Sequence, residues 1–232
     1  MEKKLDGFCA LNTKEFFEPG HTASWPYISQ LAYPWEALPK IRDIILDLGT
    51  RLDDSEYIRH GAEIWIHKTA SIAPSSYIGN AVIVGAGTEV RHCAYIRESA
   101  LIGENAVIGN STELKNVILF DRVQVPHYNY VGDSILGYKS HMGAGAITSN
   151  VKSDHSLVAV AFGKDRIDTG MKKFGAILGD NVEVGCNSVL NPGTTVGVGA
   201  TVYPLSMVRG HVPSASIYKR QGEVAIKREY AL

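Results

Sequence analysis

Two basic residues, Arg97 and Lys115, stand eighteen positions apart, and each directly follows an aliphatic residue. In a chain that winds once every eighteen residues, they would lie one above the other on successive turns and point outward. Two cations about 5 Å apart repel each other by roughly 0.8 kcal/mol in water. Such a pair is tolerated when it is solvated, or when an anion such as a phosphate joins it. The two residues therefore indicate either an anion site or two solvated surface cations.

His127 lies twelve residues beyond Lys115 and is the candidate general base. Neighbouring positive charge would hold its imidazole neutral near pH 7, as proton abstraction requires. Asn129 and Tyr130 could orient the imidazole or a substrate, and Asp133 could orient His127 or mark a bend in the chain. Because the chain has eight histidines, a packing or surface role for His127 is the alternative.

The histidines and cysteines do not indicate a metal site. His127 and His141 are fourteen residues apart, and no pair has a His-x4-His spacing. Cys93 beside His92 has no matching second pair, so we expect it to pack. Cys186 either faces a cofactor or is a small buried thiol. We therefore expect no catalytic metal.

The elements that would position these residues follow an integral period of six. Aliphatic, aromatic or proline residues occupy every sixth position, at Ile66, Ile72, Ile78, Val84, Val90, Ile96, Ile102, Ile108, Leu114, Phe120 and Pro126. This period fits neither a helix nor an alternating strand, and a sandwich of short strands would not keep it for sixty residues. It is typical of the hexapeptide repeat of a left-handed parallel β-helix, an all-β triangular prism with three six-residue faces per turn. Successive turns of such a prism lie about 4.8 Å apart.

Residues 1–62 lack the period and are expected to be helical or irregular. Asn12 and Thr13 predict a short capped helix, and Pro34 opens a second helix. The second helix presents one apolar face, formed by Leu38, Ile41, Ile45 and Leu48. We expect this segment to cap the first coil or to contact substrate.

The predicted β-helix covers residues 63–213. Its spacing shortens after Pro126, which indicates a change in backbone direction there. The pattern vanishes over residues 150–175, where strands flanking Gly163 predict a protruding hairpin. Residues 214–232 form a tail, predicted to be a further hairpin or strand.

Composition excludes several classes of protein. The chain has 232 residues and a formal net charge of −1, so we expect no nucleic-acid or anionic-membrane partner. Its apolar runs are too short to insert into a membrane, and its first residues contain no signal-peptide core. The three dispersed cysteines favour a reducing, cytoplasmic location. No glycine-rich dinucleotide or P-loop motif is present.

Three segments go beyond a generic hexapeptide pattern. They are His127-Tyr128-Asn129-Tyr130-Val131-Gly132-Asp133-Ser134, Met142-Gly143-Ala144-Gly145-Ala146-Ile147-Thr148-Ser149-Asn150, and Lys172-Lys173-Phe174-Gly175-Ala176-Ile177-Leu178-Gly179-Asp180. Over residues 65–213 the chain resembles the acetyltransferase domain of bifunctional UDP-N-acetylglucosamine pyrophosphorylase/glucosamine-1-phosphate N-acetyltransferases, especially the archaeal sugar-1-phosphate nucleotidylyltransferase type.

The resemblance implies a role for each matching residue. His127 matches the general base, and Arg97 and Lys115 match ligands of the acceptor phosphate. Tyr130 and Asn150 match contacts to the acceptor sugar, and Ala144 matches a backbone contact to acetyl-CoA. The resemblance also implies a homotrimer with sites between subunits and a place in UDP-N-acetylglucosamine biosynthesis.

The chain departs from the family pattern at several positions. His141 stands where the family has an acceptor-binding asparagine, and Cys186 replaces a serine that lines the CoA cleft. Lys152 is a weak candidate for a further family lysine. No nucleotidyltransferase motif occurs in residues 1–62.

Together, the residues and the resemblance predict an acetyl-CoA-dependent N-acetyltransferase that acts on an amino-sugar phosphate. The alternatives are a non-catalytic trimeric scaffold or sugar-nucleotide-binding regulator, and an enzyme that transfers an O-acyl group or a longer acyl chain to a nucleotide sugar.

Overall fold

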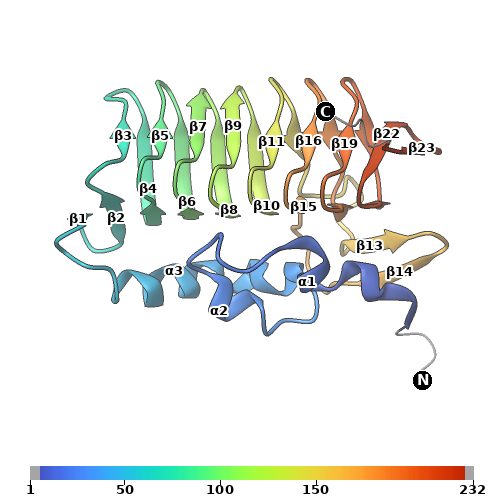
Figure 1. Ribbon diagram of the computed structural model, residues 1–232, viewed down its shortest axis with the longest axis horizontal. Coiled ribbons are helices and arrows are strands. Elements are labelled where there is room, and N and C mark those ends of the chain that lie inside the picture. Colours follow the sequence, from blue (N-terminus) through green and yellow to red (C-terminus); the bar gives the residue numbers. More distant parts are fainter. Residues whose placement is uncertain (1–5, 228–232) are drawn as a thin grey trace.

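The computed structural model describes residues 6–227 and is a parallel β-solenoid of about nine turns (Figure 1). Its strands form one 12-stranded and one 9-stranded sheet, and a two-stranded hairpin stands apart. Long strands of the larger sheet bend at residues with positive φ, such as Ser99 and Asp133, so that each contributes to two faces of the prism. The predicted β-helix is confirmed.

The helical elements precede the solenoid. They are η2 (Asp6–Leu11), α1 (Thr13–Phe16), α2 (Trp25–Ile28), η3 (Pro34–Lys40) and α3 (Ile41–Gly49). The first half of the strands are β1 (Tyr57–His60), β2 (Ile64–His67), β3 (Ser71–Ile72), β4 (Tyr77–Val84), β5 (Glu89–Val90), β6 (Tyr95–Ile102), β7 (Val107–Asn110), β8 (Glu113–Leu119), β9 (Gln124–His127), β10 (Tyr130–Leu136), β11 (His141–Met142) and β12 (Ile147–Thr148). The remainder are β13 (Ala159–Phe162), β14 (Asp165–Asp168), β15 (Ala176–Leu178), β16 (Glu183–Val184), β17 (Val189–Leu190), β18 (Thr194–Val196), β19 (Thr201–Val202), β20 (Met207–Val208), β21 (His211–Val212), β22 (Ser216–Arg220) and β23 (Glu223–Ile226).

The interior is a column of stacked aliphatic side chains, but the period of six contains a slip. Strands β4 and β6 pair at a spacing of eighteen, as at Ile78 and Ile96, whereas Ile108 pairs with Val125 at a spacing of seventeen. The pairing of β6 with β8 shifts register between Ile96 and Glu98, where one residue is extra. The predicted interior position of Pro126 is therefore wrong, and Val125 takes it.

Phe120 also leaves the predicted column because of this slip. Leu119, not Phe120, pairs with Ile102 on the neighbouring turn. Phe120 is nevertheless fully buried, since its ring lies 4.7 Å from that of Phe17 in the N-terminal segment. A second apolar partner thus keeps an aromatic residue at a position that reads as the sixth of the repeat.

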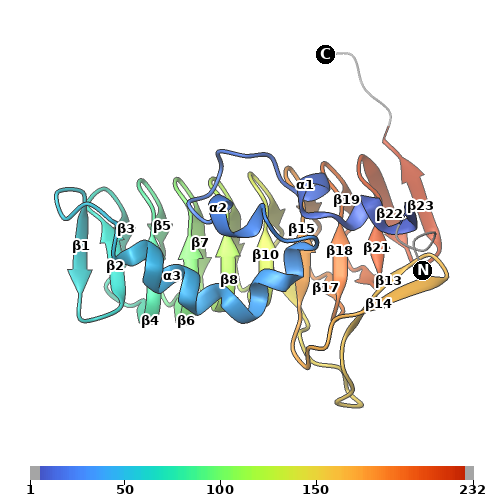
Figure 2. The same ribbon diagram turned by 90° about the horizontal axis from the view of Figure 1, so that it is seen from below.

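The helices of the N-terminal segment lie along one side of the solenoid (Figure 2). Helix α3 contacts β4, β6 and β8, and η3 contacts β10. Leu38, Ile41 and Ile45 are buried there, as the apolar face predicted. Only β1, which pairs antiparallel with β2, covers the first coil. The predicted side-chain cap at Asn12 is wrong, because Asn12 precedes α1 without a capping hydrogen bond from its side chain.

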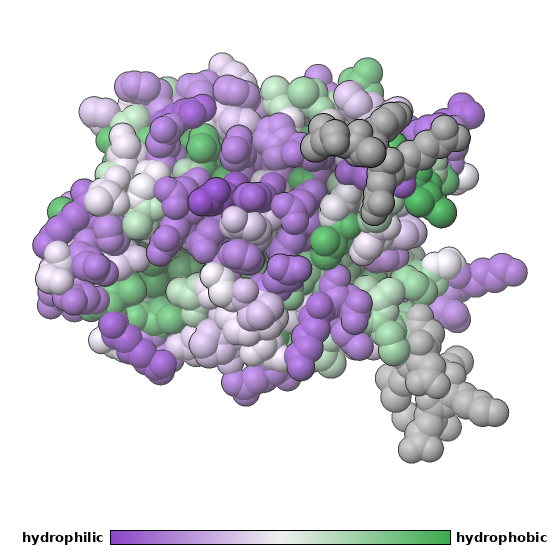
Figure 3. Space-filling view, viewed as in Figure 1, coloured by the Kyte–Doolittle hydropathy of each residue, from purple (hydrophilic) through white to green (hydrophobic). Residues whose placement is uncertain are grey.

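Two buried aspartates connect this segment to the solenoid. Asp180 accepts a hydrogen bond of 2.8 Å from the Glu18 N–H, and its own N–H donates to the Phe16 carbonyl at 3.0 Å. The N–H of Asp121 donates to the His21 carbonyl at 3.0 Å. Burial raises the pKa of both carboxyl groups. Figure 3 shows hydrophobic residues where the segment and the solenoid meet, on a face that is otherwise mainly hydrophilic.

The predicted hairpin insertion is confirmed. Strands β13 and β14 pair antiparallel around Gly163, and β13 packs against β18 and β21. The tail forms a second hairpin, since β22 pairs with β23 and extends the smaller sheet beside β19. The rest of the predicted tail, residues 228–232, lies outside the described part of the chain. None of the helices within residues 6–227 has the length and apolar character needed to cross a bilayer.

Candidate functional site

One face of the prism carries four of the predicted substrate-binding residues. We call it the site face; its outer surface is formed by residues 95–98, 113–116, 130–133 and 147–150. Arg97 lies on β6, Lys115 on β8 and Tyr130 on β10, while Asn150 follows β12. Because β6, β8, β10 and β12 are neighbours in the larger sheet, residues far apart in the chain share this face.

A buried carboxylate, Asp133, joins these residues into one network. Its Oδ1 accepts hydrogen bonds from Lys115 Nζ at 2.9 Å and Asn116 Nδ2 at 3.0 Å. Its Oδ2 accepts from Asn150 Nδ2 at 2.5 Å, and the same amide contacts the Tyr130 hydroxyl at 3.2 Å. The side chain of Asp133 is 5 % exposed. The alternative that Asp133 orients His127 is wrong, since its two oxygens bind Lys115, Asn116 and Asn150.

Arg97 and Lys115 share the site face but are not stacked as predicted. The register shift places Lys115 opposite Glu98 and leaves Arg97 as the extra residue. Each cation has its own carboxylate, since Arg97 Nη1 lies 3.0 Å from Glu113 Oε1 and Lys115 pairs with Asp133. The predicted column of two unpaired cations is therefore wrong. The exposed Arg97–Glu113 pair is weakly held and open to exchange with an anion.

Tyr130 lies between the two ion pairs. Burial is the main cause that raises the pKa of its hydroxyl, and the nearby carboxylates of Asp133 and Glu113 raise it further. The hydroxyl therefore stays protonated at neutral pH and can donate a hydrogen bond.

A second group of predicted residues stacks along the edge that precedes the site face. The His127 carbonyl accepts the Gly145 N–H at 3.0 Å, the Ala144 carbonyl accepts the Asn187 N–H at 2.8 Å, and the Cys186 carbonyl accepts the Leu205 N–H at 2.9 Å. His127, Ala144 and Cys186 thus occupy equivalent positions on three successive turns, which we call the histidine edge. The candidate base and both candidate cofactor residues are neighbours.

The backbone at this edge is fixed by a buried amide. Asn129 is 2 % exposed, and its Oδ1 accepts the backbone N–H of His127 at 3.0 Å. Its Nδ2 donates to the carbonyls of Gly143 and Ala146, each at 2.9 Å. The predicted orienting role of Asn129 therefore acts through the backbone. The His127 side chain itself is exposed, three residues from Tyr130 on the site face.

The cysteine expectations change accordingly. Cys186 is exposed at the histidine edge, so the alternative of a buried thiol is wrong. Cys93 is also exposed, and the expectation that it packs is wrong. Lys152 lies in the loop after Asn150 and bonds to Ser156. Within residues 6–227, no group of three or more His, Cys, Asp and Glu side chains is arranged to hold a metal ion.

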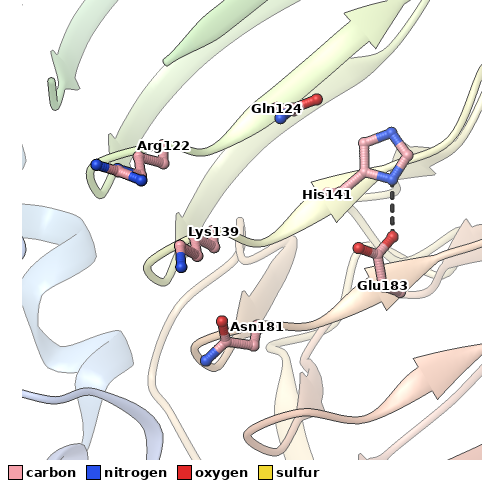
Figure 4. A pocket seen from close by; sticks show the side chains of 6 residues that line it. All are labelled: Arg122, Gln124, Lys139, His141, Asn181 and Glu183. Atoms are coloured by element: carbon pink, nitrogen blue, oxygen red, sulfur yellow. Dashed lines mark hydrogen bonds and ion pairs between the residues drawn. The ribbon is translucent and has the colours of Figure 1, made fainter. Parts of the chain in front are cut away.

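His141 is separated from the other predicted acceptor ligands. It lies on β11 in the smaller sheet, and its Nδ1 is 2.8 Å from Glu183 Oε2 on β16 (Figure 4). It lines a hollow of about 450 Å³ together with Arg122, Gln124, Lys139, Asn181 and Glu183. The sequence reasoning missed these five. Arg122 and Lys139 are seventeen residues apart, which is a recognisable signal only once the slip is known.

Comparison with known proteins supports the fold and the motifs. The family model described as "GMPPB C-terminal domain" matches residues 98–208. A "Bifunctional protein GlmU" of Methanococcus aeolicus is 29 % identical over 87 % of this chain and 49 % of its own length. A "Bifunctional sugar-1-phosphate nucleotidylyltransferase/acetyltransferase" of Sulfurisphaera tokodaii is 33 % identical over 47 % of this chain and 27 % of its own length.

Among solved structures, a hexapeptide transferase family protein from Anaplasma phagocytophilum aligns over 75 % of this chain and 84 % of its own, with 15 % identity and a TM-score of 0.42. A likeness this distant carries no conclusion. The chain spans about half the length of the first curated relative and about a quarter of the second. These relatives confirm the resemblance found in the motifs: the chain is a hexapeptide-repeat β-solenoid related to the bifunctional GlmU and sugar-1-phosphate nucleotidylyltransferase/acetyltransferase proteins.

Proposed function

We propose that this chain is an acetyl-CoA-dependent N-acetyltransferase whose acceptor is an amino-sugar phosphate of the glucosamine-1-phosphate kind. The observation that carries the proposal is the junction of the histidine edge with the site face. One side offers an exposed imidazole beside a stacked column of small residues, and the other offers cations and hydrogen-bonding groups for a sugar phosphate. The printed names of the relatives, which include an acetyltransferase, support the same class of reaction.

In this proposal His127 takes a proton from the acceptor ammonium or from the attacking amine. The freed amine attacks the thioester carbonyl of acetyl-CoA, the C–S bond breaks and the CoA thiolate leaves. The Ala144 N–H donates to no other described group, and it would stabilise the oxyanion that forms during the attack. No covalent acyl-enzyme is needed, so Cys186 would line the CoA path without reacting.

The site face would position the acceptor. Arg97 and Lys115 would bind the phosphate, and Tyr130 and Asn150 would bind sugar hydroxyls. Asp133 partly cancels the charge of Lys115, so the phosphate relies on Arg97 exchanging Glu113 for the new anion. We further propose that His141 contacts the acceptor, that the chain acts as a cytoplasmic homotrimer with sites between subunits, and that its product serves UDP-N-acetylglucosamine biosynthesis.

The direct test follows CoA release with a thiol reagent while acetyl-CoA is mixed with glucosamine-1-phosphate, glucosamine or glucose-1-phosphate. We expect release with glucosamine-1-phosphate, slower release with glucosamine because the phosphate contacts are lost, and none with glucose-1-phosphate because it lacks an amine. Release with glucose-1-phosphate would indicate O-acyl transfer. The absence of release with every amino sugar and nucleotide-linked amino sugar would favour a binding scaffold.

A further inference from the structure

The hollow around His141 has a lining of polar and charged side chains alone. Arg122, Lys139 and Asn181 come from three successive turns at one edge, and Gln124, His141 and Glu183 come from the neighbouring strands (Figure 4). Its volume of about 450 Å³ is large enough for a small metabolite. A lining without apolar side chains offers little to an aromatic or alkyl group, so a suitable ligand is itself polar.

Two cations are held side by side at the rim of this hollow. Arg122 and Lys139 lie on successive turns, since the Lys139 N–H donates to the Asp121 carbonyl directly before Arg122 at 3.1 Å. Both have positive φ, at 61° and 56°, which fixes them at the same corner of the prism. Lys139 Nζ lies 5.0 Å from the centroid of the Tyr138 ring. Such a contact stabilises the ammonium without neutralising it.

Neither cation has a carboxylate partner among residues 6–227. Glu183, the acidic residue of the lining, is bonded to His141 at 2.8 Å. Asp121, next to Arg122 in the chain, accepts the Glu104 N–H at 2.7 Å. This arrangement contrasts with the site face, where Arg97 and Lys115 each have a carboxylate. The rim of the hollow therefore offers an anion more uncompensated positive charge than the site face does.

We propose that this hollow is a second binding site, and that its ligand is a small polyhydroxy phosphate ester such as a sugar phosphate. The guanidinium of Arg122 and the ammonium of Lys139 would bind the phosphate, one as a planar fork and one as a point charge. The amides of Gln124 and Asn181 and the imidazole of His141 would hydrogen-bond to hydroxyl groups. The site is on a different face from Tyr130 and Asn150, and it does not depend on acetyl transfer.

The test uses a local reporter, the imidazole proton resonances of His141 in the full chain, assigned by their loss in His141→Gln. The probe is glucose-1-phosphate, which has no amine to acetylate, with glucose as the phosphate-free control. The double variant Arg122→Asn/Lys139→Asn removes both cations, and asparagine tolerates the positive φ at these corners. Lys164→Asn, at the exposed turn of the β13–β14 hairpin, is a charge-matched control. Thermal melting of each variant verifies the fold.

We expect glucose-1-phosphate to shift the His141 resonances saturably in the wild-type chain and in Lys164→Asn, with Kd values within twofold of each other. In the double variant we expect the Kd to rise at least tenfold, and glucose should produce no saturable shift. Three results would overturn the proposal: resonances that do not move, an equal Kd in the double variant, or an equal response to glucose.

Discussion

Lys115 Nζ lies 2.9 Å from Asp133 Oδ1, and the two side chains are only 16 % and 5 % exposed. The pair is thus largely removed from water, unlike the exposed pair of Arg97 and Glu113. A buried ion pair contributes little net stability relative to an apolar replacement, but removing one partner leaves an uncompensated buried charge. Asp133 therefore determines where Lys115 and Asn150 can point, and with them the shape of the proposed acceptor site.

The substitution Asp133→Asn should destabilise the fold by about 3 kcal/mol, because it leaves the Lys115 ammonium buried without a counter-charge. Urea unfolding of Asp133→Asn, Lys115→Met and the double variant measures the coupling. The double variant should cost clearly less than the sum of the two single variants. Additive costs would show that the two side chains do not depend on each other.

Lys115→Gln should affect a phosphorylated acceptor more than an unphosphorylated one, if Lys115 binds the phosphate. We expect the KM for glucosamine-1-phosphate to rise about tenfold or more, which corresponds to about 1.4 kcal/mol of lost binding, while the KM for glucosamine stays within twofold. Steady-state kinetics with the two acceptors makes the comparison. Equal increases would place Lys115 outside the phosphate site.

The N-terminal segment should contribute to stability through the apolar face of α3. Ile45 is fully buried between α3 and the solenoid, so Ile45→Ala should cost 2–5 kcal/mol, the usual range for such a truncation, or about 3 kcal/mol. Leu205→Ala, at a residue that is 80 % exposed, is the control and should cost less than about 0.5 kcal/mol. Chemical denaturation measures both, and a near-zero cost for Ile45→Ala would show that the segment is not part of the cooperative unit.

His211 should make the fold sensitive to acid. Burial lowers the pKa of its imidazole from 6.5 to about 4, and its ring packs beside Phe16 and Phe162. The neutral form is therefore favoured in the folded state, and the contribution to stability is fully present above pH 6.5. It falls as the pH drops from 6.5 towards 4, because only the unfolded chain takes up the proton readily. The full loss is on the order of 3 kcal/mol.

His211→Gln removes this titration and keeps a side chain that can hydrogen-bond to Thr195, the present partner of His211 at 2.9 Å. Unfolding free energies measured from pH 7.5 to 4 should fall less steeply in the variant than in the wild type. Parallel curves would show that His211 does not titrate with folding.

The sequence predicted the solenoid because a narrow prism interior requires an aliphatic side chain at every sixth position. The same pattern concealed the slip between Ile96 and Glu98. Phe120 and Pro126 are apolar and buried for other reasons, so the period of six continues through them although the interior residues are Leu119 and Val125.

That one-residue slip explains which site residues were misplaced. It moves Lys115 out of line with Arg97, and it brings Arg122 into line with Lys139 at a spacing of seventeen. The histidine edge was predicted well because its positions follow from motifs that lie after the slip. The role of Asp133 could not be predicted, because a side chain at a bend can turn towards either of the two faces that meet there.

The central claim, acetyl transfer with His127 as the base, is tested most directly by one comparison. It is the rate of CoA release from acetyl-CoA and glucosamine-1-phosphate by the wild-type chain and by His127→Ala, with binding of both substrates measured in parallel. We predict that His127→Ala loses at least a hundredfold in kcat, in line with the loss of a general base, while the fold and both Kd values are retained. An unchanged kcat in a folded His127→Ala protein would contradict the account.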